Sequence, residues 1–168
     1  HLGEEIVKAC RAATSPDFPI ILRYSQWKQQ DYDARLAPTQ SELEAFLAPL
    51  TDAGVDIFHC STRRFWEPEF EGSNMNLAGW TKKLTGKPTI SVGSVSLNEE
   101  FIATFAGMDA ANDEGHMDDL LERMEADEFD LIAVGRALIS DHEWAAKIHK
   151  GQFDNLNPFT KEALATLY

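Results

Sequence analysis

The chain has 168 residues, of which 43% are hydrophobic and 26% are charged, enough for one globular domain with a sizeable core. Its formal net charge of −13 argues against nucleic acid as a partner, because a phosphate backbone binds a basic surface. No apolar run approaches the roughly 18 residues that cross a bilayer, so we expect no membrane partner.

Helical and strand patterns alternate along the chain. An amphipathic helix in residues 1–14 comes first, followed by a strand at 19–24, a helix at 39–53, a strand at 55–60, a helix at 76–84, a strand at 89–92, a helix at 116–126, a strand at 129–134, and helices at 141–150 and 158–168. Ser41, ahead of Glu42 and Glu44, signals the start of the second helix, and Gly54 signals its end. The four strands are short and continuously apolar, as buried parallel strands are, and recur about every 33–41 residues.

Regular alternation of strand and helix predicts a parallel sheet, either open and doubly wound or closed into a barrel. A dinucleotide-binding open sheet usually carries a GxGxxG after its first strand, and none is present here. Polar residues follow the C-terminal end of every strand, which is the active face of a barrel. Four strands cannot close a (β/α)8 TIM barrel, so residues 1–168 are expected to form its C-terminal half, strands 5 to 8. A missing N-terminal half-barrel chain or a second copy would complete this single domain.

A charged side chain, Arg23, interrupts the first apolar strand. A charge in such a strand is costly unless it is paired. One interpretation is a salt bridge to a structural carboxylate. The other is that Arg23 points into the mouth of the barrel and contacts an anionic ligand.

Two glycines mark the ends of the third and fourth strands, in the pairs Gly93 with Ser94 and Gly135 with Arg136. A glycine at this point lets a ligand approach the backbone and leaves N–H groups for a phosphate. Arg136 would add a fork-shaped donor. The loops after strands 7 and 8 form the usual phosphate site of such barrels, so these four residues form a candidate phosphate site. Ordinary turn chemistry is the alternative for each glycine taken singly.

The second strand ends in His59 and Cys60, which could suggest a metal ligand or a nucleophile. Adjacent residues on a strand point to opposite faces, and no second ligand pair has zinc-like spacing, so we predict no metal site. His59 is interpreted as a core histidine. Cys60 and Cys10 lie in apolar runs and are expected to be buried and reduced, which favours a cytoplasmic protein. The aromatic and charged segment 61–73 suits a loop that walls a substrate pocket.

Five segments, taken in order, carry a family resemblance: ILRYSQWK, HCSTRRFWEPEFEGS, NLAGWTKKLTGKP, SVGSVSL and FDLIAVGRALISDHEW. They resemble the Old Yellow Enzyme family of NAD(P)H:flavin oxidoreductases, also called ene-reductases. The resemblance extends over almost the whole chain and corresponds to the second half of the family barrel. It implies FMN as cofactor and NADH or NADPH as reductant. In the family, hydride passes from the nicotinamide to flavin N5 and then to the β-carbon of an activated alkene.

The resemblance also implies roles for the cofactor-binding residues. Arg23 matches the arginine that contacts the N1/O2 edge of the flavin, where reduction places negative charge. Gly93 and Ser94 match the loop that meets the ribityl phosphate. Gly135 and Arg136 match the phosphate clamp of the eighth strand, where the arginine pairs with the phosphate.

The substrate-activating residues of the family have no counterpart in this chain. A histidine with a second histidine or an asparagine, and a proton-donating tyrosine, follow strand 4 of the complete barrel, so we assign no catalytic residue and expect the chain alone to be inactive. Trp27 and Trp66 are aromatic candidates for one wall of the substrate pocket. Two alternatives stay open. One is a non-catalytic half-barrel that pairs with a partner and binds no flavin, and the other is an unrelated phosphate-binding barrel enzyme.

Overall fold

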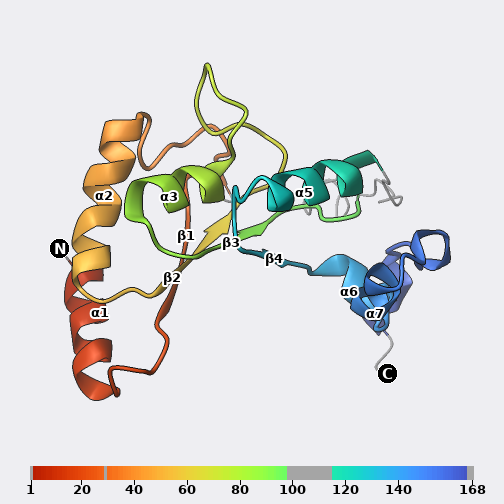
Figure 1. Ribbon diagram of the computed structural model, residues 1–168, viewed down its shortest axis with the longest axis horizontal. Helices are drawn as coiled ribbons and strands as arrows, with labels where there is room; N and C mark the ends of the chain where they lie inside the picture. The colour runs from red at the N-terminus through yellow and green to blue at the C-terminus, as the bar shows by residue number, and fades with distance from the viewer. Residues whose placement is uncertain (1, 29, 98–114, 166–168) are drawn as a thin grey trace.

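The computed structural model describes residues 2–28, 30–97 and 115–165, and follows the predicted alternation of strand and helix (Figure 1). The strands are β1 (Ile21–Ser25), β2 (Ile57–Ser61), β3 (Thr89–Val92) and β4 (Leu131–Ala133). The helices are α1 (Leu2–Ala13), α2 (Gln40–Asp52), α3 (Leu77–Thr85), α5 (Gly115–Glu125), α6 (Arg136–Ser140) and α7 (Trp144–His149), with the short 3₁₀ helices η1 (Phe153–Asn155) and η2 (Lys161–Ala165). Within the described ranges, none of the helices is long and apolar enough to cross a membrane.

The four strands form one parallel sheet whose spatial order, β1-β2-β3-β4, is that of the sequence. Each crossover therefore joins neighbouring strands, as in a (β/α)8 barrel, whereas a doubly wound sheet reverses its strand order. Because all strands run in the same direction, their C-terminal ends meet at one edge. The α/β class and the half-barrel that the sequence predicts are thereby confirmed.

One face of the sheet packs against helices and holds the apolar core. Tyr24 contacts Phe46 of α2 with ring centroids 5.5 Å apart, and it meets Phe58 of β2 edge-on at 6.3 Å. Cys60 is fully buried on the same face, with Sγ 3.4 Å from Thr81 Oγ1 of α3. Burial raises the pKa of Cys60 to about 12, so its thiol is protonated at neutral pH and is not a nucleophile.

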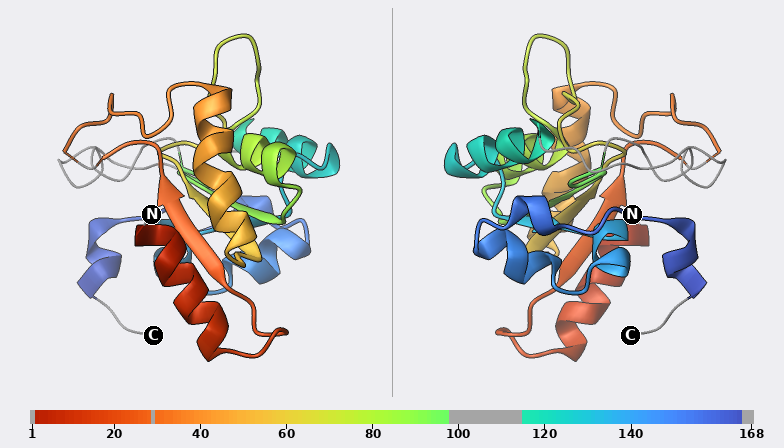
Figure 2. Two further views of the ribbon diagram at one scale, coloured as in Figure 1. Left: turned by 90° about the vertical axis from the view of Figure 1, so that its left-hand side faces the viewer. Right: turned by 90° about the vertical axis from the view of Figure 1, so that its right-hand side faces the viewer.

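On the opposite face, which we call the open face, side chains align in rows that cross the sheet, with one residue from each strand in a row. One row contains Arg23, His59, Ile90 and Leu131, and the next contains Ser25, Ser61, Val92 and Ala133. In the left view of Figure 2, α3 and α5 lie to one side of the sheet and η2 to the other. Ile21 and Leu131 are each 52% exposed. The strands are thus buried on one face only, whereas the sequence predicts burial on both, because four strands cannot enclose their own inner face.

Two aspartates hold the N-terminal edge of the sheet. Asp56 Oδ2 accepts the Ile20 N–H at 2.7 Å and pairs with Arg11 of α1. Asp130 Oδ2 accepts the Thr89 N–H at 2.8 Å in the same way, between β3 and β4. The hydrogen bond from the Ile20 backbone is the main cause that lowers the pKa of Asp56. Each aspartate precedes one strand and ties its start to the start of the preceding strand.

Several local expectations from the sequence are wrong. The capping box of α2 is on Thr39 and not on Ser41, because Thr39 Oγ1 accepts the Glu42 N–H while the Glu42 carboxylate accepts the Thr39 N–H. Cys10 is exposed on α1, which buries only Val7. The inward stripe of α1 is therefore narrower than its apolar spacing suggests.

The C-terminal part also differs from the prediction. The segment after β4 forms the short helix α6, which the sequence pattern does not predict. Asp141 ends α6, and α7 begins only at Trp144, because the buried Asp141 carboxylate accepts bonds from Lys147 Nζ at 2.7 Å and the Asn157 N–H at 2.9 Å. The helix predicted at 158–168 is reduced to η2, and residues 166–168 lie outside the described ranges.

Asn76 joins α3 to the loop after β2 and to β3. Its Oδ1 accepts the Gly79 N–H at 2.9 Å, and its Nδ2 donates to Phe65 O at 2.8 Å and Ser91 Oγ at 3.1 Å. We expect Asn76→Ala to lower the free energy of unfolding by about 2–4 kcal/mol, since a helix cap and a buried donor are lost together. The solvent-exposed cap variant Thr39→Ala should cost about 1 kcal/mol. Urea unfolding measures the stability that each variant loses. Equal losses in Asn76→Ala and Thr39→Ala would contradict the prediction that the buried hydrogen bonds of Asn76 add to its role as a helix cap.

Candidate functional site

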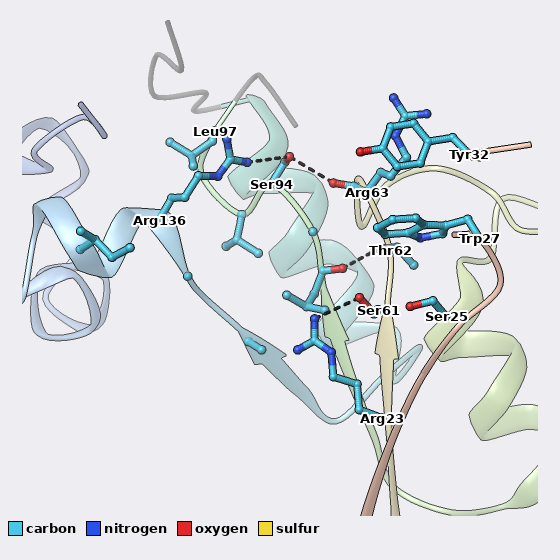
Figure 3. A pocket seen from close by; sticks show the side chains of 16 residues that line it. Arg23, Ser25, Trp27, Tyr32, Ser61, Thr62, Arg63, Ser94, Leu97 and Arg136 are labelled. Carbon is cyan, nitrogen blue, oxygen red and sulfur yellow. Dashed lines mark hydrogen bonds between the residues drawn. The ribbon is translucent and has the colours of Figure 1, made fainter. Parts of the chain in front are cut away.

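The C-terminal ends of the four strands surround a cavity of about 600 Å³ (Figure 3). This volume lies in the range of pockets that hold small molecules and cofactors. Six residues that the sequence singles out line it together: Arg23, Trp27, Gly93, Ser94, Gly135 and Arg136. The fold therefore brings all five predicted cofactor-binding residues, and one of the two predicted pocket tryptophans, to a single site.

The lining of the cavity is positively charged. Among the described residues, three arginines, Arg23, Arg63 and Arg136, line it, and no aspartate or glutamate does. The whole chain carries a net charge of −13, so this is a local excess. A cavity lined by one sign of charge attracts ligands of the other sign. In the part of the chain that the structure describes, no three His, Cys, Asp or Glu side chains gather to hold a metal ion.

Arg23 extends from β1 into the cavity, and its partners are neutral. Its Nη2 donates to Ser61 Oγ at 3.0 Å, and its Nη1 lies 3.2 Å from His59 Nε2. Burial, and then the charge of Arg23, lower the pKa of His59, so the imidazole is uncharged at neutral pH. His59 is thus a half-buried neighbour of Arg23 on the open face and not a core histidine. Among the described residues, no carboxylate forms the structural salt bridge that the sequence left open for Arg23.

Ser94 connects the loops that follow β2 and β4. Its Oγ donates to Arg63 O at 3.1 Å and accepts a hydrogen bond from Arg136 Nη2 at 3.2 Å (Figure 3). The preceding residue, Gly93, has φ +146°, and a Cβ there would lie 2.8 Å from Thr62 O. The approach of the Thr62 backbone is sufficient to require glycine at this position, a reason that the sequence alone does not show.

Gly135 and Arg136 turn the chain from β4 into α6. A Cβ at Gly135 would meet no atom of the described residues within 4 Å, so with respect to these residues the backbone here borders open space. The first turn of α6 has no side-chain cap. In (β/α)8 barrels the phosphate site commonly includes the start of a short extra helix near the eighth strand. Helix α6 occupies the equivalent position after the last strand here.

Aromatic side chains form one wall of the cavity. Trp27 and Tyr32 both line it, with ring centroids 5.0 Å apart and planes at 77°. Trp27 Nε1 is buried and has no acceptor among the described residues. Trp66, the second predicted pocket residue, does not line the cavity. Its ring stacks on His116 of α5 at 3.5 Å and packs edge-on against Phe65 at 5.1 Å.

The sequence interpretation does not name Tyr32 or Arg63 as site residues, although Arg63 lies in the segment 61–73 that it assigns to the wall of a substrate pocket. The Arg63 guanidinium carbon lies 4.1 Å from the centroid of the Tyr32 ring. A signal for Arg63 exists, since it follows His59 and Ser61 at the alternate positions that share one face of a strand. Tyr32 lies in a polar segment without periodicity, so no local pattern indicates that it reaches the cavity.

A half-buried acid, Glu69, lies behind the aromatic wall. It lines a second and smaller cavity that shares Trp27 and Tyr32 with the first. Gln26 Nε2 donates to Glu69 Oε1 at 3.0 Å. Burial raises the pKa of Glu69 to about 7, although the charge of Arg35 and the Gln26 hydrogen bond act in the opposite direction. Near neutral pH this carboxyl group therefore exists in both protonation states.

Two known proteins share features with this chain. The NADH oxidase of Thermoanaerobacter brockii is 31% identical over 159 residues, which cover 88% of this chain and 20% of that protein. The structure of morphinone reductase in complex with tetrahydroNAD matches the fold with a TM-score of 0.57 and 14% identity, over 95% of this chain and 35% of that one. These two matches support the resemblance to the Old Yellow Enzyme family. No family model matches the sequence.

The Old Yellow Enzyme resemblance of the five sequence segments is thus confirmed, together with the partial barrel. The chain spans about a fifth of the length of the NADH oxidase and about a third of the morphinone reductase chain. Both relatives are oxidoreductases by name. Their activities belong to proteins much longer than the segment described above.

The two glycines of the site should respond differently to substitution. Gly93→Ala places a Cβ against the Thr62 backbone at φ +146°, and we expect it to lower the free energy of unfolding by about 1–3 kcal/mol. Gly135→Ala meets open space at φ −112° and should change stability by less than about 0.5 kcal/mol. Chemical denaturation measures the free energy of unfolding of both variants. A larger loss of stability in Gly135→Ala than in Gly93→Ala would contradict the prediction that only Gly93 is needed to make room for neighbouring backbone.

Glu69 should make stability depend on pH. Its folded-state pKa of about 7 lies above the ordinary 4.5, so the folded protein binds the proton more tightly than the unfolded chain. Relative to Glu69→Gln, the wild type should therefore lose stability as pH rises through this interval, by on the order of 2 kcal/mol in total. The difference in the free energy of unfolding between wild type and Glu69→Gln should then stay constant above the folded-state pKa. Urea unfolding across this pH range measures it, with the exposed Glu67→Gln as control; a difference that does not vary with pH would argue against a half-buried acid.

Proposed function

We propose that the chain provides the FMN-binding half of an NAD(P)H-dependent oxidoreductase that reduces activated C=C bonds, such as those of enones. One observation carries the proposal: Arg23, Ser94 and Arg136, the positions with expected flavin contacts, meet in a single cavity. These are the positions to which the family resemblance assigns contacts with the flavin. A nicotinamide nucleotide as reductant is supported by the two relatives, an NADH oxidase and a morphinone reductase bound to tetrahydroNAD.

The ribityl phosphate is assigned to the end of the cavity next to β4. Arg136 presents a planar guanidinium there, and the fork of an arginine matches the oxygens of a phosphate. Ser94 Oγ accepts a bond from Arg136 Nη2 at 3.2 Å, which orients the guanidinium. Gly135 borders open space, so a phosphate can approach the backbone closely at this point. The residues present therefore fit the phosphate group of FMN.

The flavin ring is assigned to the β1 side of the cavity, where Arg23 would face its N1/O2 edge. Ser61 and the uncharged His59 hold the Arg23 guanidinium without neutralising it, so its charge stays available to a ligand. The buried Trp27 Nε1 is a further donor on this wall. When bound, FMN would supply the hydride chemistry between NAD(P)H and the alkene. This chain would bind and orient the cofactor and hold positive charge at its edge.

An N-terminal half-barrel is the proposed partner of the open face. Ile21 and Leu131 are half-exposed there, and the inner face of a barrel is normally filled by its other strands. That half would also supply the substrate-activating residues, so residues 1–168 would be one half of a single domain. A second copy of the chain could cover the same face but would bring none of those residues. A module that pairs without flavin would give no reason for the three arginines of the cavity.

The phosphate assignment is tested by comparing FMN with riboflavin, which lacks the phosphate. In the chain completed by its N-terminal half, Arg136→Gln should weaken FMN binding by about 10- to 100-fold, as expected for a lost charged hydrogen bond, and change riboflavin binding little. The matched control is Arg64→Gln, whose guanidinium is ion-paired with Glu67 at 3.0 Å. Titration of flavin fluorescence measures both ligands.

Three results would count against the proposal. Unchanged FMN affinity in Arg136→Gln would show that the phosphate binds elsewhere. An equal loss of FMN and riboflavin would indicate general damage to the site and not a lost phosphate contact. A wild-type protein that shows no visible flavin band after incubation with FMN would overturn the flavin proposal and favour the non-catalytic assembly module.

A further inference from the structure

His59 lies beside Arg23 on the open face, and the flavin roles give it no function of its own. It is aligned with Arg23 across β1 and β2, but it is not among the described residues that line the cavity, whereas Arg23 and Ser61 are. We propose that His59 is a positioning residue: as the neutral Nδ1–H tautomer it holds the Arg23 guanidinium, and so controls how strongly the site prefers reduced over oxidised FMN. This inference rests on the proposed function, because it assigns Arg23 to the flavin edge.

The contact between the two side chains determines where the imidazole carries its proton. Arg23 Nη1 lies 3.2 Å from His59 Nε2. A guanidinium has N–H donors and no acceptor, so Nε2 must be the acceptor of this hydrogen bond. The proton of the neutral ring is then on Nδ1. A protonated imidazole has a donor at both nitrogens, and it would face the guanidinium with N–H against N–H and with like charges.

The surroundings of His59 favour the uncharged ring that this contact requires. The residues aligned with it on the neighbouring strands are Arg23 of β1 and Ile90 of β3, and Ser61 follows on the same face of β2. Among these described neighbours only Arg23 carries a charge. Burial, and then the charge of Arg23, lower the pKa of His59. At neutral pH the ring therefore accepts a hydrogen bond from Arg23 and leaves its positive charge in place.

Two hydrogen bonds, made by different nitrogens, determine the direction of the guanidinium. Arg23 Nη2 donates to Ser61 Oγ at 3.0 Å, at the cavity lining, as Figure 3 shows. Nη1 donates to His59, two residues before Ser61 on β2. One bond alone would let the planar group turn about it, whereas bonds at both ends of the group hold its plane. The remaining N–H donors of Arg23 are left for a ligand.

The direction of this cation matters because the charge that it would meet changes during the reaction. Reduction places negative charge at the N1/O2 edge of a flavin, so a cation held at that edge binds the reduced state more tightly than the oxidised state. A group that is already oriented stabilises the new charge without first having to reorganise. His59 would therefore act on the difference between the two redox states, through Arg23 and without touching the flavin.

The first test compares the two redox states of FMN in the chain completed by its N-terminal half. The reduction potential of bound FMN, measured against that of free FMN, gives the ratio of the affinities for reduced and oxidised cofactor. His59→Leu removes the acceptor and should lower this ratio by about 10-fold, as expected for a lost charged hydrogen bond. His59→Gln keeps a neutral acceptor and should restore most of the ratio. The matched control is His149→Leu, at an exposed histidine of α7, which should leave the ratio unchanged.

The second test determines the tautomer directly. Nitrogen NMR of the same completed enzyme, labelled in its histidine rings and held at neutral pH, should show His59 with its proton on Nδ1 and with Nε2 unprotonated. The spectrum of His59→Gln assigns the signal, because it lacks it. An Nε2–H tautomer or a charged ring would overturn the inference. This measurement uses the wild-type chain, so it decides the point even if His59→Leu does not fold.

The remaining outcomes separate this inference from the proposed function. An unchanged affinity ratio in His59→Leu would overturn the inference while the proposed function stands. Equal losses in His59→Leu and His59→Gln would show that the packing of the ring matters and not its acceptor, and would overturn it as well. A wild-type enzyme that fails to bind FMN would remove the proposed function and this inference together.

Discussion

The parallel register of β1 and β2 aligns Arg23 with His59 and Tyr24 with Cys60, and the rest of the structure depends on this pairing. Because side chains alternate across a strand, the first pair lies on the open face and the second lies under the helices. A shift of one residue would bury Arg23 in the apolar core and expose Tyr24. The cationic cavity and the hydrophobic core are thus two consequences of one register.

Two aspartates and the arginines of the cavity lie at opposite ends of the strands. The aspartates Asp56 and Asp130 lie at the N-terminal edge of the sheet, where their carboxylates accept backbone N–H groups. The arginines of the cavity lie at the opposite edge, where Arg23 is held by a hydroxyl and an uncharged imidazole. In this strongly acidic chain, these two carboxylates therefore lie at the edge of the sheet opposite the arginines of the cavity. Net charge describes the whole surface and not the site.

The aromatic wall divides two environments that share side chains. In front of it lies the cavity with its three arginines, and behind it lies the half-buried Glu69 with a raised pKa. Trp27 and Tyr32 come from one segment, and Arg63 comes from the loop after the next strand. The contact of Arg63 with Tyr32, and the bond of its carbonyl with the Ser94 hydroxyl, make the wall a connection between neighbouring βα units. A change on one side of the wall can therefore alter the position of residues on the other.

Local patterns in the sequence were sufficient for the order of the four strands and of the helices that precede and connect them. Apolar runs of strand length and helical periodicity both indicate which residues are buried. Phe58 and Leu47 are fully buried, as the few residues around each of them in the sequence predict. The same patterns failed where a distant contact decided the outcome. Asp141 ends a helix instead of starting one, because its carboxylate is held by Lys147 and the Asn157 backbone. Trp66 stacks on His116 of α5, a contact across the chain that no local pattern indicates.

The sequence by itself determined the half-barrel class, the family and the residues at the strand ends, because the carboxyl ends of parallel strands must meet at one edge. Only the tertiary structure decided why each of those residues is needed. Gly93 makes room for the Thr62 backbone, whereas Gly135 borders open space. The contact of Arg63 with Tyr32, from a segment that no local pattern indicates, is likewise seen only in the tertiary structure. The physical reason is distance along the chain. Periodicity within one element shows which of its sides is buried. The contacts of the remaining side chains depend on how loops that are far apart in the sequence pack together.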